Sequence, residues 1–220
     1  IARRQRQMCI RDSNKWLAFV QTAFNTMEQI KIYNVELDAS FDLTTDRANS
    51  FNPRWSHDGK FIYFLSDRNF KSLVGSPWGT RQPEPYFDVS EKLYHVALEK
   101  GTRSPFREKD ELDCDDNNDV TSKKRVNKKN KRKVKVDSLV IKIDYAGIQK
   151  RILEVPIEPG NYNGLEVNGK ALYLISSETG VKPKRNLSYV KIDSEDLKLK
   201  PLVCDVNSFN LCGNGEKILV

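Results

Sequence analysis

The apolar residues of this chain fall into short runs, and four of these runs each follow a turn built from Asn, Asp or Gly with Lys. The runs are WLAFV, FIYFL, ALYLI and ILV, and the lysines before them are Lys15, Lys60, Lys170 and Lys217. FIYFL is apolar throughout, which is typical of a strand that is buried on both faces. A turn and strand repeated at this scale predicts a β-propeller, although a single such hairpin would fit an antiparallel sandwich equally well.

The spacing of the repeats agrees with blades. The four lysines are 45, 110 and 47 residues apart, and blades usually span roughly 40–50 residues, so the long interval should contain an insertion. Third strands are expected in the runs QIKIYNVEL, KLYHVAL and LSYVKID, and a fourth strand in FDLTTD or RILEVPI. A further strand-like run, LVIKIDYAG at 139–147, leaves the register between the second and third repeats open. We therefore expect an all-β propeller fragment of about four incomplete blades of antiparallel strands.

The turns themselves have a residue pattern that favours tight hairpins. Type I′ turns need positive φ at both central residues, which Asp58-Gly59 tolerates. Asn168-Gly169 and Asn214-Gly215 have the same chemistry. The sequence thus predicts a two-residue hairpin loop at each of these sites.

The ends of the chain differ from the repeats. Residues 1–13, IARRQRQMCIRDS, have no strand or helix period and no apolar core of a signal peptide. MCIRDS resembles a translated sequencing-adapter tail, and the alternative is a natural basic arm. Because Val220 lies within an apolar run, we expect a fragment with blades over 14–106 and 136–220.

The net charge is +7 and the isoelectric point is about 9.1, but the charge is concentrated in segments outside the expected blades. Residues 1–13 contribute +3, the run 123–135 contributes +9, and the run 107–119 contributes −5, so the remaining chain is neutral. We expect 107–135 to be a disordered, charged insertion that neutralises itself. A basic tract can also bind nucleic acid or an anionic lipid, but this one has no aromatic residue to stack on bases, and we expect no specific nucleic-acid partner.

Residue patterns that would support catalysis or metal binding are missing. There is no G-x-S-x-G, P-loop or G-x-G-x-x-G motif. Ser56 and His57 are adjacent on an extended segment and so point apart, and His95 has no assignable nucleophile. The four cysteines have no zinc-site spacing, and no run is long enough to cross a membrane. We expect no catalytic residue, no cofactor and no metal in this segment, and its compartment stays open.

The segment 66–90 is long for a connection within a blade. It combines Arg68, Arg81 and Gln82 with Trp78 and Tyr86, and several prolines stiffen it. Arginine and aromatic residues commonly anchor interfaces. This segment is therefore a candidate interaction loop, and the alternative is that it caps its own blade.

RWSHDGKFIYFLSDR resembles the WSPDG-type repeat of TolB-like and tricorn-type propellers, with His57 where the repeat usually has Pro. The continuation NFKSLVGSPWGTRQPEPYFD, and later DYAGIQKRILEVPIEPGNYNGLEVNGKALYL, is similar to the propeller part of tricorn-type proteases, which are tail-specific serine peptidases. The resemblance runs from about Asn14 to Val220.

The resemblance implies a non-catalytic propeller portion that scaffolds a protease site encoded downstream and gates the access of peptides to it. In the family the catalytic residues follow the propellers, so no catalytic position carries over to this segment. The implied partners are peptides or unfolded polypeptide, together with further copies in a homo-oligomer. Two alternatives stay open: a TolB-like binding propeller without an enzyme, and a propeller cap on an α/β-hydrolase peptidase.

Overall fold

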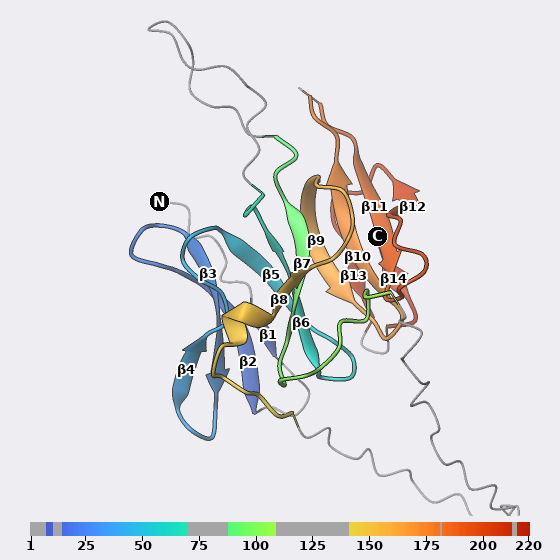
Figure 1. Ribbon diagram of the computed structural model, residues 1–220. Coiled ribbons are helices and arrows are strands. Elements are labelled where there is room, and N and C mark those ends of the chain that lie inside the picture. The colour runs from blue at the N-terminus through green and yellow to red at the C-terminus, as the bar shows by residue number, and fades with distance from the viewer. Residues whose placement is uncertain (1–7, 11–14, 70–87, 109–140, 181, 213–214) are drawn as a thin grey trace, which may run out of the picture.

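The computed structural model describes residues 8–10, 15–69, 88–108, 141–180, 182–212 and 215–220. Over these ranges the chain is built from strands and one short 3-10 helix, η1 (Ile148–Arg151). The strands form three four-stranded antiparallel sheets and one two-stranded sheet, and strand order in each sheet follows chain order. The expected all-β architecture is confirmed, with three complete blades and a hairpin of a fourth (Figure 1).

The blades follow one another along the chain. Blade 1 consists of β1 (Met8–Ile10), β2 (Trp16–Thr22), β3 (Glu28–Asn34) and β4 (Ala39–Asp42). Blade 2 consists of β5 (Ser50–Trp55), β6 (Phe61–Ser66), β7 (Lys92–Ala97) and β8 (Ile152–Glu154). Blade 3 consists of β9 (Asn161–Val167), β10 (Ala171–Ser177), β11 (Arg185–Lys191) and β12 (Lys200–Cys204). The last hairpin consists of β13 (Asn210–Leu211) and β14 (Ile218–Leu219).

The hydrophobic core lies between the blades. One cluster joins blades 1 and 2 and includes Ile32 and Phe64. A second joins blades 2 and 3 and includes Tyr63 and Leu172, and a smaller third cluster joins blade 3 to the last hairpin. Because each middle sheet buries apolar side chains on both faces, its stability depends on both neighbours.

The four apolar runs after the turns form the second strands β2, β6, β10 and β14, as the repeat predicts. All six residues of β6 are buried, which agrees with the unbroken apolar run from Phe61 to Leu65. Third strands form in three of the expected runs, as β3, β7 and β11. Each copy of the turn and apolar run in the sequence therefore corresponds to the second strand of one blade.

The predicted type I′ turn is wrong at Asp58-Gly59, and also at Asn168-Gly169, where neither residue has a positive φ. Gly59 has a φ of 72°, whereas Asp58 is not among the residues with positive φ. The Gly59 N–H donates to the Ser56 carbonyl at 3.1 Å, and the Ser56 N–H donates to the Phe61 carbonyl at 2.9 Å. The loop is therefore four residues long, with a left-handed glycine at its third position, a common way to close a longer hairpin loop.

The strand expected at 139–147 is absent from its described part, residues 141–147. This segment instead packs against the core between blades 1 and 2 through Ile141, Ile143 and Tyr145, and the Asp144 N–H donates to the Leu98 carbonyl at 2.9 Å. The chain then forms η1 and enters β8 (Figure 1). The charged insertion predicted for 107–135 thus falls between the third and fourth strands of blade 2, and beyond residue 108 it lies outside the described residues.

Part of the segment 1–13 contributes a strand to blade 1, contrary to the expectation that this segment stands apart from the blades. Met8–Ile10 forms β1, which pairs with β2 in the register Met8↔Phe19 to Ile10↔Leu17. A three-residue strand has too few positions to show a period, so the sequence pattern gave no signal for it.

Candidate functional site

The candidate interaction loop is described only at its two ends. Arg68 lies just after β6, and its guanidinium carbon lies 5.2 Å from the centre of the Tyr94 ring and 5.7 Å from that of Phe64. Its Nε donates to the Ser66 hydroxyl at 3.2 Å, and burial lowers the pKa of this guanidinium. Cation–π contacts of this kind hold the cation in place. Arg68 is therefore an anchor within blade 2, whereas Trp78, Arg81, Gln82 and Tyr86 lie outside the described residues.

The far end of the same loop is attached to blade 3. The Asp88 carboxylate accepts hydrogen bonds from the Thr179 hydroxyl and, at 2.8 Å, from the Asn161 amide. These two bonds lower the pKa of Asp88. The Asn161 side chain also accepts from the Val89 N–H at 2.9 Å. The loop therefore starts on blade 2 and returns across the boundary with blade 3.

The first strands of the blades gather on one side of the molecule. β1 contacts β5, β5 contacts β9, and β9 contacts β13, whereas the outer strands β4 and β12 lie at opposite sides of Figure 1. Arg54 on β5 and Glu166 on β9 form an ion pair of 2.9 Å, and each side chain is 24% exposed. The first strands thus define the axis side of the array, and this pair joins blades 2 and 3 there.

The turns after the first strands also touch one another. The His57 ring lies against Gly169, where an added Cβ would be 3.6 Å from His57 Cδ2. The Asn168 amide donates to the Gly215 carbonyl at 3.0 Å. An added Cβ at Gly215 would lie 2.9 Å from Asn168 Cβ, so only glycine fits this contact. His57, which replaces the usual proline of the repeat, is therefore part of a contact between blades.

The two remaining groups considered for chemistry occupy structural positions. His95 on β7 is 1% exposed and packs against Phe61, Tyr63 and Phe106, with ring centroids 5.3–6.1 Å apart. Neither of its ring nitrogens has a hydrogen-bond partner within the described ranges, and burial lowers its pKa to about 4. The Ser56 hydroxyl donates to Asp58 at 2.6 Å and accepts from the Phe61 N–H at 2.9 Å. His95 is thus a neutral core residue and Ser56 a turn residue.

Cysteines and acidic residues show no metal chemistry in the described part of the chain. Cys204 and Cys212 are both exposed and free. Among the described residues, no group of three or more His, Cys, Asp or Glu side chains could hold a metal ion. Over the same ranges, no helix has the length and hydropathy of a membrane span.

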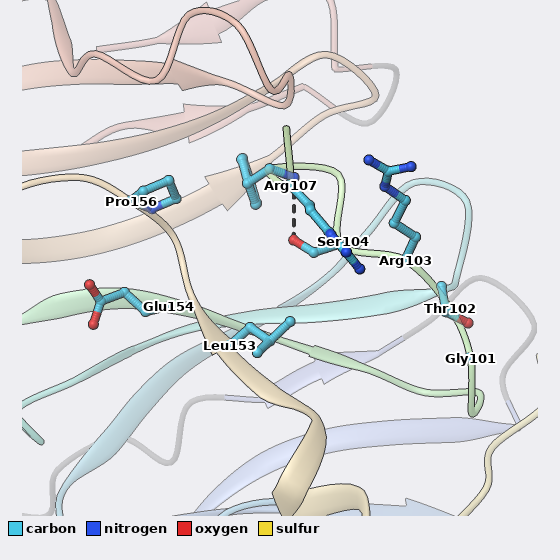
Figure 2. Close-up of a pocket in the computed structure, with 9 residues that line it drawn as sticks. Gly101, Thr102, Arg103, Ser104, Arg107, Leu153, Glu154 and Pro156 are labelled. Carbon is cyan, nitrogen blue, oxygen red and sulfur yellow. Dashed lines mark hydrogen bonds between the residues drawn. The ribbon is translucent and has the colours of Figure 1, made fainter. Parts of the chain in front are cut away.

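A pocket at the outer edge of blade 2 has no direct signal in the sequence. The pocket has a volume of about 590 Å³. One wall is the loop 101–107 that follows β7, and the other is formed by Leu153, Glu154 and Pro156 in and after β8 (Figure 2). RILEVPI was expected to contain a fourth strand, and it forms β8, but only the folded structure shows that Leu153, Glu154 and Pro156 line a pocket.

Comparisons with known proteins agree with this architecture. The family described as "Tricorn protease second beta propeller domain" matches residues 4–220. Tricorn protease homolog 1 of Streptomyces coelicolor is 23% identical over 224 residues, which cover 94% of this chain and 19% of that protein. A Tricorn-like protease C-terminal subunit of Sulfurisphaera tokodaii is 23% identical over 222 residues, which cover 97% of this chain and 22% of that protein.

A solved structure gives the same picture. The crystal structure of the tricorn protease superposes with a TM-score of 0.69 at 16% identity, covering 96% of this chain and 19% of that one. At this identity the match shows a shared fold. The chain spans about a fifth of the length of the curated relatives it matches. Because the family match spans nearly the whole of this chain, the chain belongs to the family of second β-propeller domains of tricorn proteases.

Proposed function

We propose that this chain is the non-catalytic propeller portion of a tricorn-like serine peptidase, where it scaffolds the protease site and gates the access of peptides to it. The observation that carries the proposal is the succession of first strands on the axis side, where β5 and β9 lie next to each other. A propeller of complete blades encloses a passage at this axis. Side chains on the first strands would then meet whatever passes through.

The Arg54–Glu166 pair supports the proposal because it places opposite charges on neighbouring blades at the axis side. Each side chain remains 24% exposed, so both charged groups are accessible to a solute and can interact with it. The pair also links the two blades, because its partners come from different sheets. Scaffolding and gating would thus involve the same residues.

The test uses a full-length peptidase that contains this propeller, with its native cysteines replaced by serine. Glu166→Cys is labelled with a large polyethylene glycol maleimide, and turnover of a long unfolded polypeptide is compared with turnover of a short chromogenic peptide. Leu202→Cys, on the outer strand β12 and 47% exposed, carries the same label as the matched control. The unlabelled Glu166→Cys enzyme corrects for the loss of the ion pair.

The proposal predicts that the label at position 166 lowers the turnover of the long substrate relative to the short one. The label at position 202 should leave this ratio unchanged, because β12 lies away from the axis side (Figure 1). Equal ratios for the two labelled enzymes would contradict a gating role.

A further inference from the structure

The strand pairing aligns the three complete blades residue by residue. In each blade one row of side chains crosses the second, third and fourth strands and faces the next blade. The rows are Ala18, Ile32 and Phe41 in blade 1, Tyr63, His95 and Leu153 in blade 2, and Tyr173, Tyr189 and Lys200 in blade 3. Each row ends on the outer strand, so the outer positions Phe41, Leu153 and Lys200 are equivalent.

In blade 1 this outer position is covered by an aromatic side chain from another segment. Tyr145, which follows the charged insertion of blade 2, stacks on Phe41 with ring centroids 3.8 Å apart and an interplanar angle of 23°. Tyr145 also lies 6.2 Å from Trp16 in the core between blades 1 and 2. The outer position of blade 1 is therefore covered by a tyrosine from the segment that precedes η1.

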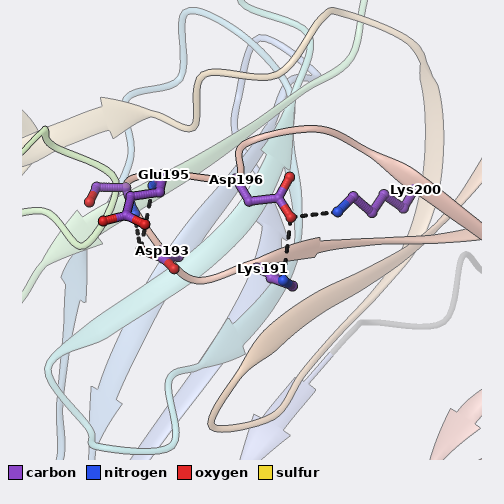
Figure 3. A network of polar contacts seen from close by, with 6 residues as sticks. Lys191, Asp193, Glu195, Asp196 and Lys200 are labelled. Atoms are coloured by element: carbon purple, nitrogen blue, oxygen red, sulfur yellow. Dashed lines mark hydrogen bonds and ion pairs between the residues drawn. The ribbon is translucent and has the colours of Figure 1, made fainter.

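In blade 3 the same position is polar. Lys200 and Lys191 both form ion pairs with the Asp196 carboxylate, and the Lys191 distance is 3.3 Å (Figure 3). These pairs lower the pKa of Asp196 and, at Lys200, raise that of the ammonium group. An apolar side chain would have to displace these charges, so this position does not suit an aromatic ligand.

In blade 2 the equivalent residue, Leu153, is 48% exposed and lines the 590 Å³ pocket. Phe106 and Pro156 add apolar surface, and Arg103 and Arg107 come from the loop opposite β8 (Figure 2). The carboxylate of Glu154, which also lines the pocket, is bound by Lys92 at 2.8 Å. Because Arg103 already donates to the Glu108 carbonyl, the pocket combines an apolar floor with the positive charge of Arg107.

Directly inward from Leu153 in the same row lies His95. It is 1% exposed, and within the described ranges its ring nitrogens have no hydrogen-bond partner. Phe106, which lines the pocket, packs edge-on against the imidazole at 5.3 Å. His95 is therefore a core residue beneath the pocket floor and is not itself offered to a ligand.

We propose that this outer-edge pocket binds a segment of a separate polypeptide that places an aromatic side chain on Leu153 next to an acidic residue. The precedent is blade 1, where the equivalent residue Phe41 is already stacked by a tyrosine from another segment. The acidic neighbour follows from charge complementarity with Arg107. The site lies on the outer strand β8, away from the first strands, and is thus separate from the proposed passage.

The test measures fluorescence anisotropy of the labelled peptide Gly-Asp-Tyr-Glu-Gly with the whole chain. Leu153→Asp should weaken binding at least about tenfold, because it places a carboxylate on the apolar floor and next to the acidic peptide. Arg107→Ala should weaken it by about three- to tenfold through loss of one charge pairing. Leu202→Asp is the matched control, since Leu202 has nearly the same exposure, 47%, on the outer strand of blade 3. Circular dichroism checks that each variant is folded.

Two control peptides test the chemistry of the ligand. Gly-Asp-Ala-Glu-Gly should bind at least about tenfold more weakly, and Gly-Lys-Tyr-Lys-Gly should not bind, if both the ring and the negative charge are recognised. No binding of the acidic tyrosine peptide, or binding that Leu153→Asp leaves unchanged, would overturn the proposal. Binding only to a variant that lacks residues 109–119 would show that the chain's own acidic run is the occupant and would overturn a separate partner.

Discussion

Within blade 2, the middle strand β6 and the outer strand β8 belong to one sheet but have different surroundings. Every residue of β6 is buried, and its side chains enter the cores on both faces. Leu153 on β8 is half exposed and lines a pocket. The middle strands repeat from blade to blade, whereas the outer positions Phe41, Leu153 and Lys200 differ. The blades thus share a core and acquire their differences at the outer edge.

The largest effect should come from the middle strand. Phe64 is fully buried in the core between blades 1 and 2, so Phe64→Ala should lower the free energy of unfolding by about 3–5 kcal/mol. Leu153→Ala on the outer strand should cost less than about 1 kcal/mol, because half of this side chain is already exposed. Urea unfolding measures both, and equal losses would contradict the contrast between the two strands.

A second effect should appear in acid. The pKa of His95 is depressed to about 4 in the folded chain, against about 6.5 for the unfolded one, so the folded state favours the neutral imidazole. This pKa difference contributes its full amount to the free energy of unfolding above about pH 6.5. As the pH falls toward 4, up to about 3 kcal/mol of that free energy is lost. Tyr63, which packs against it, stays neutral in this range because burial raises its pKa.

The measurement is urea unfolding of the wild-type chain and of His95→Leu between pH 7 and pH 4. The unfolding free energy of the wild type should fall relative to that of His95→Leu as the pH decreases, because only the wild type buries an imidazole that must stay neutral. A difference that is constant over this range would show that His95 can be protonated in the folded state without penalty.

The smallest effect should come from the covered outer edge of blade 1. Tyr145→Ala removes the ring that stacks on Phe41 and should cost about 1–2 kcal/mol. Phe24→Ala is the control, because Phe24 is fully exposed at a hairpin tip and should change stability by less than about 0.5 kcal/mol. Thermal unfolding of the two variants compares them, and a Tyr145 variant as stable as the Phe24 variant would mean that the stack contributes nothing.

Much of the fold was predictable because it is local. The turns before Trp16, Phe61 and Ala171 start the second strands, and their apolar runs show which strands are buried. The run 139–147 was misassigned because alternating apolar residues also suit an extended segment that packs on a neighbouring blade without joining a ladder. The turn at Asp58-Gly59 was assigned the wrong type because the dipeptide fits more than one loop length.

The candidate site was less predictable because it depends on contacts between distant residues. Arg54 and Glu166 are 112 positions apart, and only the packing of two blades brings them together. The equivalence of Phe41 and Leu153 depends on strand register, which an irregular insertion conceals in the sequence. Of the interaction loop proposed from the sequence, Arg68 contacts Tyr94 within blade 2, and an interface role for Arg68 and the other members stays a prediction.

The central claim is that this chain frames a peptidase site that it does not itself contain. The most direct measurement is the turnover of a panel of fluorogenic peptides by the purified chain alone, with and without a serine-directed reagent. We predict no turnover above the rate of the buffer. Turnover that the pure chain sustains and the serine reagent abolishes would contradict this account.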